Sequence, residues 1–451
     1  MRSHGGSAWA TGIGVAGAAV LLAAGASPAA AIPSFSRQTK LPCSACHTQF
    51  PELNSFGRVF KLNGYTLRMI ETIESTDTTG HQDLAISLMP LPSVMMQASE
   101  TYTARPQPGT TNGTVMLPDQ LSVFLAGAIT PKVGAFIQVT YDPQSGTVGM
   151  DNTDIRYATP ITLASQPGVF GLTLNNNPTV QDIWNASPAW GFPYVGSAVA
   201  PTPAAGTMVD GALAQQVAGL TAYLFWNDLV YAEFGGYRWA PQGAPALPDA
   251  SVSGVVEGIA PYWRVALTRP IGSGYLEVGT YGMAAHAQPG SFVSGGPTDS
   301  YTDVALDAEY QVPVGDNNLT VAGTWIHESR NLSASVAAGT AAVASQSVNT
   351  IRARATYMVD QSYAFTVSPF ATTGTADTLL YAPAAVGGSA SGSPNSTGVV
   401  LQADWNPWMN TRLSLQYTVY TKFNGGTTNY DGSGRDASAN NTLYLQAWLM
   451  F

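Results

Sequence analysis

The two cysteines of the chain lie in a single short run, Cys43 to His47, and a histidine directly follows the second cysteine. Two thiols at this spacing can form thioether bonds to the vinyl groups of a haem, and the adjacent imidazole can then bind the iron. A disulfide-redox pair would not need the histidine, and zinc would need further ligands at regular spacing. The run therefore predicts one covalent haem c bound by Cys43, Cys46 and His47, with His47 as the proximal iron ligand.

The iron of such a haem has a second axial position, opposite His47. Methionine, histidine or an open position are the alternatives, and methionine raises the reduction potential. Neighbouring residues of a strand point to opposite sides, so either Met95 or Met96 can face the haem, but not both. We predict Met95 as the distal ligand. Four alternatives stay open: Met69, Met96, Met89 and His81.

Residues 32–83 are predicted to be a small helical segment that carries the haem. A short helix is expected over residues 51–63, with Gly64 in the position where helices commonly stop. Arg58 and Lys61 lie three residues apart on this helix. Charge-assisted hydrogen bonds to carboxylates are strong in partly buried sites, so we predict that both bind the haem propionates. A solvated helix face is the alternative for the pair.

The composition is unusual for a soluble protein. Of 451 residues, 45% are hydrophobic and only 10% are charged, whereas soluble domains carry about 25% charged residues. After the N-terminal region, no stretch of 18 or more apolar residues occurs, so no spanning helix is predicted. Low charge with many Gly, Thr, Ser, Asn and Tyr residues favours a β-barrel surrounded by outer-membrane lipid.

Residues 1–31 have the features of a secretory signal peptide. Their apolar stretch, Thr11 to Gly25, is too short to span a membrane stably, and Ala29 to Ala31 provide a small-residue cleavage site. Export is consistent with a c-type haem, which is attached on the far side of the inner membrane.

Polar and apolar residues alternate from residue 84 onward with the period of two that is typical of β-strands. In the last segment, Leu443, Leu445 and Leu449 share one face with the terminal Phe451. Such an apolar face would meet lipid, and the polar face would meet a wet lumen. Five further segments alternate in the same way: 132–142, 301–310, 349–359, 399–406 and 411–421.

The predicted fold class is all-β: a transmembrane antiparallel β-barrel of about 16 strands, with a small N-terminal α-helical c-type haem segment that plugs its lumen. The haem-bearing part, residues 32 to about 72, is too small to enclose a haem alone, because domains below roughly 40 residues seldom build a sufficient core. The barrel interior is the large space that can cover it. The predicted domains are a signal peptide (1–31), a monohaem cytochrome segment (32–83) and an outer-membrane barrel (84–451). A soluble sandwich is the alternative.

The net charge of −10 argues against nucleic acid as a partner. It is compatible with a cationic partner or a metal ion. Asp303, Asp307 and Glu309 occupy the polar face of one predicted strand and could attract a divalent cation in the lumen. We predict no catalytic side chain, because no Ser-His-Asp set, phosphate loop or paired-carboxylate pattern stands out.

Several runs resemble the fused cytochrome–porin family, which comprises outer-membrane monohaem c-type cytochromes of iron-oxidising bacteria. The N-terminal motif is specific, whereas the rest of the chain matches the family mainly in length and strand pattern. The runs that carry the resemblance are Ile32 to Thr39, Cys43 to His47, Phe50 to Leu53, Phe56 to Arg58, Phe60 to Tyr65, Leu174 to Asn185 and Pro188 to Trp190.

The resemblance implies a haem at the base of a barrel of about sixteen strands, in the outer membrane. It implies an oxidoreductase that oxidises extracellular Fe(II) and passes the electron through the haem to a periplasmic carrier, either a small copper protein or a soluble cytochrome c. Two alternatives remain: a general outer-membrane electron port for other donors, and a diffusion porin with a structural haem. Porins often form trimers, so a homotrimer is also considered.

Overall fold

The structure is a computed structural model of the chain, and it describes residues 33–67, 72–76, 83–87, 92–240 and 252–451. The predicted signal peptide lies outside the described residues. So do three of the alternative distal ligands, Met69, His81 and Met89.

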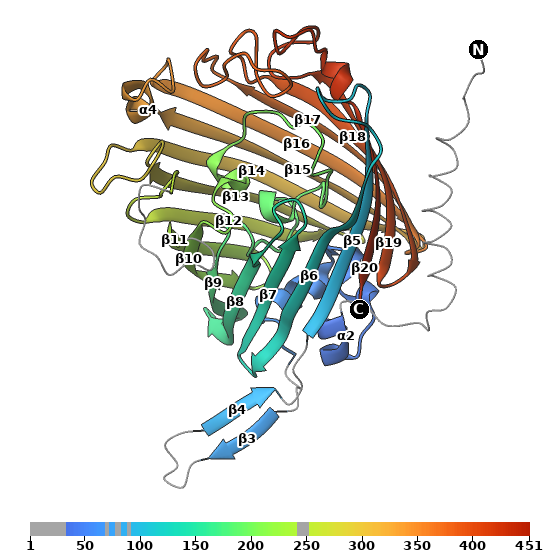
Figure 1. Cartoon of the computed structure of the whole chain (residues 1–451). Helices are drawn as coiled ribbons and strands as arrows, with labels where there is room; N and C mark the ends of the chain where they lie inside the picture. The colour runs from blue at the N-terminus through green and yellow to red at the C-terminus, as the bar shows by residue number, and fades with distance from the viewer. Residues whose placement is uncertain (1–32, 68–71, 77–82, 88–91, 241–251) are drawn as a thin grey trace, which may run out of the picture.

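Sixteen antiparallel strands of the described chain form a closed barrel (Figure 1). They follow one another in chain order, and the last strand pairs with the first. Closure satisfies the backbone hydrogen bonds of these strands within the wall, as a lipid environment requires. The predicted antiparallel barrel is thereby confirmed. The strands are β5 (Pro92–Thr103), β6 (Thr114–Thr130), β7 (Val133–Asp142), β8 (Thr147–Leu163), β9 (Gln166–Asn175), β10 (Val217–Trp226), β11 (Val230–Trp239), β12 (Ala260–Ile271), β13 (Gly274–Ala287), β14 (Asp299–Val314), β15 (Asn317–Asn331), β16 (Ser345–Val359), β17 (Tyr363–Gly374), β18 (Ser396–Trp408), β19 (Thr411–Lys422) and β20 (Thr442–Met450).

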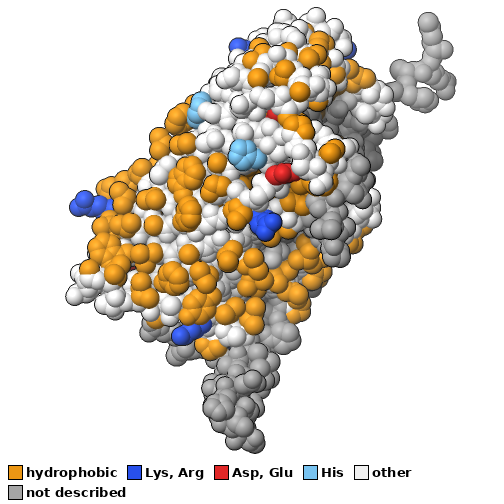
Figure 2. Space-filling model, turned by 90° about the vertical axis from the view of Figure 1, so that its left-hand side faces the viewer, with side chains coloured by type: hydrophobic (Ala, Val, Ile, Leu, Met, Phe, Trp, Pro, Cys, Tyr) orange, Lys and Arg blue, Asp and Glu red, His pale blue; other side chains and the backbone are white. Residues whose placement is uncertain are grey.

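The outer surface of the barrel is apolar. On β14, Val304 and Leu306 are exposed, whereas Asp303, Asp307 and Glu309 point inward and are buried. Figure 2 shows hydrophobic side chains spread over the barrel wall, with few charged ones among them. An apolar exterior with a polar interior is the pattern of barrels that cross a lipid bilayer. The alternation predicted from the sequence is confirmed for this strand.

The connections between strands differ in length at the two ends of the barrel. At one end the chain turns tightly, for example at residues 131–132 and 164–165. At the other end long segments join the strands, for example 176–216 and 375–395. In outer-membrane barrels short turns face the periplasm and long loops face the outside. We therefore call these ends the periplasmic end and the outer end.

The N-terminal segment lies at the base of the barrel, at its periplasmic end (Figure 1). The Tyr223 hydroxyl of the wall donates to the carbonyl oxygen of Leu62 at 2.6 Å. Gly134 of β7 lies so close to this segment that a Cβ there would be 2.0 Å from the carbonyl oxygen of Gly64. A residue larger than glycine would therefore push the segment off the wall. Its elements are α2 (Pro33–Thr39), η1 (Cys43–Ala45), β1 (His47–Gln49), β2 (Glu52–Leu53) and α3 (Ser55–Leu62).

The helix expected over residues 51–63 is shorter in the structure. The Asn54 side chain accepts a hydrogen bond from the Gly57 N–H at 3.0 Å, and this N-cap starts α3 at Ser55. The two residues expected to begin the helix, Pro51 and Glu52, lie before this cap, and Glu52 begins β2.

No helix among the described residues is long and apolar enough to cross a membrane.

The barrel wall begins later than expected. Its first strand starts at Pro92, not at residue 84. The residues from Asp83 to Ser87 form β4, which pairs with β3 (Thr72–Thr76) in a separate two-stranded sheet. Figure 1 shows this hairpin projecting below the periplasmic end. Alternation of polar and apolar residues indicates a strand, but it does not identify the sheet to which that strand belongs.

The segment 176–216 between β9 and β10, here called the inserted loop, folds back into the lumen. Its Trp184 is fully buried, and its Asp182 forms an ion pair with Arg264 of β12 at 3.3 Å. Burial alone would raise the pKa of Asp182, but Arg264 and the Trp184 N–H outweigh it and hold the pKa below its usual range. The barrel therefore contains two inserted pieces of chain, the N-terminal segment and this loop.

Candidate functional site

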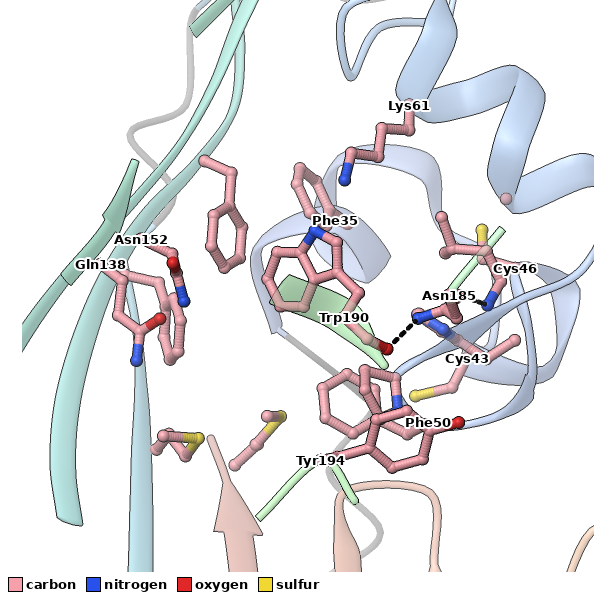
Figure 3. A pocket seen from close by; sticks show the side chains of 18 of the residues that line it. Phe35, Cys43, Cys46, Phe50, Lys61, Gln138, Asn152, Asn185, Trp190 and Tyr194 are labelled. Carbon is pink, nitrogen blue, oxygen red and sulfur yellow. Dashed lines mark hydrogen bonds between the residues drawn. The ribbon is translucent and has the colours of Figure 1, made fainter. Parts of the chain in front are cut away.

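A cavity of about 290 Å³ lies between the N-terminal segment, the wall of β5 to β8 and the inserted loop (Figure 3). Cys43, Cys46 and His47 all line it. Cavities that bind cofactors are commonly apolar, with a few placed polar groups. Nine Phe, Tyr and Trp side chains contribute to its walls: Phe35, Phe50, Phe60, Tyr65, Phe124, Phe136, Trp190, Tyr194 and Trp448.

The backbone around the two cysteines is compact. The Cys46 N–H donates to the Cys43 carbonyl oxygen at 3.0 Å, which closes a single turn of η1. The carbonyl of Cys46 in turn accepts from the Asn54 N–H at 2.9 Å. A Cβ at Gly57 would lie 2.2 Å from that carbonyl, so α3 can pack against the turn only with glycine there. The Cys43 Sγ donates to the Met409 carbonyl oxygen at 3.3 Å, beside a periplasmic turn.

His47 is set up as a neutral ligand. Its Nδ1 lies 3.2 Å from the carbonyl oxygen of Glu52, and its ring meets Phe50 edge to face at 5.2 Å. Burial lowers the pKa of His47 to about 4, so the imidazole is uncharged at neutral pH. An Nδ1–H that donates to a carbonyl leaves the lone pair on Nε2 available to a metal.

Glu52, which orients His47 through its carbonyl, is anchored to the barrel by its buried carboxylate. The carboxylate pairs with Arg354 of β16. Burial would raise the pKa of Glu52, but Arg354 and the hydroxyls of Thr320 and Thr48 outweigh it, and the pKa is lowered. Further donors are Gln311 Nε2 and the Tyr194 hydroxyl, both at 3.2 Å. One carboxylate thus connects the N-terminal segment, the wall and the inserted loop.

No protein-family model matches the chain, and no curated protein matches it. Solved structures of outer-membrane proteins resemble it in fold. OmpTdeltaL8 of Vibrio cholerae, a loop L8 deletion mutant of OmpT, is 12% identical, with 80% of this chain and 99% of that chain covered and a TM-score of 0.46. The outer membrane channel DcaP of Acinetobacter baumannii is 11% identical, with coverages of 80% and 96% and a TM-score of 0.46. The anion-selective porin from Comamonas acidovorans is 12% identical, with coverages of 80% and 99% and a TM-score of 0.46.

The barrel lies in the outer membrane. Three properties of the structure support this location: the closed ring of antiparallel strands, the apolar outer surface, and the contrast between short turns and long loops. The outer-membrane location predicted from the sequence is therefore confirmed.

The two basic residues of α3 have different surroundings. Lys61 lines the cavity, and its Nζ donates to the carbonyl oxygens of Val180 and Asp182 at 2.7 and 2.8 Å. Burial, and then the charge of Arg156, lowers the pKa of Lys61 to about 7. Among the described residues that line the cavity, Lys61 is the remaining candidate to bind a propionate.

Arg58 does not have the surroundings expected of a propionate ligand. It does not line the cavity; its guanidinium donates to Glu309 at 2.5 Å and to the Leu53 carbonyl oxygen at 3.1 Å. Glu309 also accepts from Arg354 at 3.1 Å. Arg58 therefore pairs with a carboxylate of the barrel wall, whereas the sequence predicted that it would bind a propionate.

Three methionines lie near the cavity mouth, on β5 and β20. Met95 is buried and lines the cavity, whereas Met96 points to the other side of β5. Met450 was not predicted, yet it pairs with Met95 across the strands and lines the same cavity. The alternation of side chains along the strand could have identified Met450. Leu449 and Phe451 face the lipid, so Met450 between them must point inward.

The acidic residues of β14 point into the barrel as predicted, and two of them have partners there. Asp307 pairs with Arg264 at 2.6 Å, and Asp303 accepts from the Val209 N–H of the inserted loop at 2.7 Å. Within the described ranges, no group of three or more His, Cys, Asp or Glu residues has the geometry of a metal site.

Proposed function

We propose that the protein is an outer-membrane monohaem c-type cytochrome within a porin-like barrel, which oxidises extracellular Fe(II) and delivers the electron to a periplasmic carrier. One observation carries the proposal: Cys43, Cys46 and His47 line one aromatic-walled cavity inside the barrel. These residues fit a haem c, whose thioether bonds need two thiols on one turn and whose iron needs a neutral imidazole.

A bound haem c supplies one-electron chemistry at its iron. The chain supplies position and surroundings. Cys43 and Cys46 would hold the group covalently, and His47, whose Nδ1 lies at the Glu52 carbonyl, would bind its iron. Met95 or Met450, which line the same cavity, would supply a thioether. Methionine ligation raises the potential, which suits a donor as weakly reducing as Fe(II).

A diffusion porin also fits the porin-like barrel, and one observation is set against that alternative here: part of the inner wall is buried. Wall residues halfway along the strands, such as Arg264, Glu277 and Tyr281, are fully buried. The inserted loop covers them, for example through Trp184, over which Arg264 lies at 4.9 Å from the ring centre. An open barrel of this size would leave an aqueous channel with these side chains hydrated. Electrons can cross such packed material, whereas a solute needs a continuous aqueous path from end to end.

The periplasmic side of the site is accessible to an acceptor. A second cavity of about 280 Å³ shares Cys43, His47, Phe50, Trp448 and Met450 with the first, and residues 360–362 and 406–412 at the periplasmic end also border it. A redox partner at this mouth would approach the covalent attachment point itself. A small copper protein or a soluble cytochrome c is the acceptor we propose.

The first test is the cofactor. The mature protein, produced with a c-type haem maturation system, should gain the mass of one haem after denaturation. The Cys43→Ala, Cys46→Ala double variant should lose it while still inserting as a barrel. A wild-type chain without covalent haem would end the proposal.

The second test is the donor. Fe(II) should reduce the haem of the purified protein rapidly, as followed by its visible spectrum, and a periplasmic carrier should reoxidise it. Equal rates with unrelated donors at matched driving force would instead support the general electron port. The homotrimer stays a prediction, which native mass measurement in detergent can check.

A further inference from the structure

A β-bulge occurs in the wall of the haem cavity. Between Ile137 and Val139 of β7 the register with β8 shifts, so that Gln138 faces two residues, Asp151 and Asn152. Neighbours on a regular strand point to opposite sides, but a bulge re-aims a side chain and is common next to functional sites. Both Asp151 and Asn152 line the cavity as a result.

The Asp151 carboxylate lines the cavity and has no cationic partner among the described residues. Its carboxylate accepts from the Thr140 hydroxyl at 2.9 Å, from Gln215 Nε2 at 3.1 Å and from the Asn152 N–H at 2.8 Å, which are all neutral donors. Asp182, which also lines the cavity, is paired with Arg264. No ion pair involves Asp151 among the described residues, so its charge is not compensated.

Two glutamine side chains lie beside this carboxylate, and the Gln120 Nε2 also donates toward its Oδ2 at 3.5 Å. Gln138 donates its amide hydrogens to Ser122 and Thr140, and Gln120 donates toward the same hydroxyls. Their Oε1 atoms accept no hydrogen bond from the part of the chain that the structure describes, and both residues line the cavity. One carboxylate with amide oxygens suits a hard divalent cation that keeps several of its waters.

The patch lies on the outer side of the haem-attachment site. Asp151 is near the start of β8, beside the exposed turn 143–146 of the outer end. Cys43 instead touches Met409 at the periplasmic rim. In Figure 3, Gln138 and Asn152 lie on the wall opposite Cys43 and Cys46, with Trp190 between them. Asp151 therefore lies nearer the outer end of the barrel than Cys43 does.

We propose that Gln120, Gln138, Asp151 and Asn152 form the binding site for the electron donor, a hydrated divalent iron ion. This inference rests on the proposed function and adds the place of its substrate. Asp151 attracts the cation, and the amide oxygens of Gln120 and Gln138 accept hydrogen bonds from its waters or bind it directly. The Asn152 Oδ1, which accepts from Asn177 Nδ2 at 2.8 Å, borders the site. Each Fe(II) gives up one electron, the haem gains that electron, and Fe(III) leaves with no covalent bond made. A single carboxylate holds the ion weakly enough to release it.

The test compares Asp151→Asn with Asp142→Asn in the haem-loaded protein. Asp142 is an exposed carboxylate at the outer end of the same hairpin and does not line the cavity. Asp151→Asn should raise the Fe(II) concentration for half-maximal haem reduction about tenfold, since steering by charge changes encounter rates by at least this factor. Asp142→Asn should change it little, and Asp151→Glu should restore binding. Reduction by a neutral hydroquinone should be equal in all four proteins.

A second readout separates the inference from the proposed function. Binding of Mn(II), which does not reduce the haem, is measured by electron paramagnetic resonance in the oxidised protein. Asp151→Asn should weaken it, and unchanged Mn(II) binding would overturn the inference. If Fe(II) fails to reduce the wild-type haem while the hydroquinone succeeds, the proposed function fails, and the Mn(II) comparison still decides the site. Slower reduction by both donors in Asp151→Asn would also overturn the inference, because it would indicate general damage.

Discussion

Single residues at the cavity mouth decide the ligation of the proposed haem. We predict that Met95→Ala removes the methionine–iron absorption band and lowers the reduction potential, because methionine ligation raises it. Met96→Ala is the matched control, since Met96 is the next residue of β5 and points away from the cavity. Optical spectra and redox titration of both variants measure the effect.

Met450 is the alternative methionine ligand to Met95. It lies opposite Met95 on β20 and lines the same cavity. If Met450→Ala removes the band while Met95→Ala keeps it, Met95 is not the ligand and Met450 is. A band that survives in both single variants and disappears in the double variant would mean that either thioether can bind.

At the scale of elements, the N-terminal segment is held in the barrel by buried charge. Arg354→Gln leaves the carboxylates of Glu52 and Glu309 without this partner. Breaking a buried ion pair costs roughly 3–5 kcal/mol, so we predict that the segment docks more weakly. Faster hydrogen exchange at the N–H groups of Leu53 and Asn54 would report it.

Arg352→Gln is the control on the same strand. Arg352 pairs with Asp210 of the inserted loop, and its side chain is 32% exposed. Its removal should leave exchange in the N-terminal segment unchanged. Equal exchange in the two variants would show that Arg354 has no special part in docking.

The inserted loop should respond to acid through Asp182. Because the pKa of Asp182 is lowered in the fold, its stabilisation is complete above the ordinary carboxyl pKa of about 3.9 and is lost as the pH falls through the lower folded value. Asp182 accepts from the N–H groups of Trp184, Ala186 and Ser187. Protection of these amides from hydrogen exchange, relative to the intrinsic exchange rate at each pH, should fall in acid for the wild type.

Asp182→Asn should show fast exchange at these amides already at neutral pH, with little further change in acid. A wild-type profile that stays flat down to strong acid would contradict the assigned role of the Asp182–Arg264 pair.

At the scale of the whole molecule, the lumen is packed, so we expect little ion conductance. An empty barrel of this size has an aqueous channel, whereas here the inserted loop and the N-terminal segment bury the inner wall. Planar-bilayer recordings of the full chain should show currents far below those of an open porin measured alongside it. Large, steady currents would favour a diffusion porin with a structural haem.

The sequence alone predicted features that depend on near neighbours in the chain. The alternation of β20, with Leu445 outward and Trp448 inward, is confirmed by burial, since a side-chain period of two follows from local backbone geometry. The spacing of Cys43, Cys46 and His47 places them on one turn for the same reason. Their attachment to haem stays a prediction.

Only the tertiary structure decided which distant residues meet. Glu309 is 251 positions from Arg58, and Met450 reaches Met95 only because the barrel closes between its last and first strands. The bulge that turns Asp151 and Asn152 to the same cavity depends on the register between two strands. A periodic pattern indicates the side to which a residue points, but register and closure determine its partner, and these arise from the packing of the complete barrel.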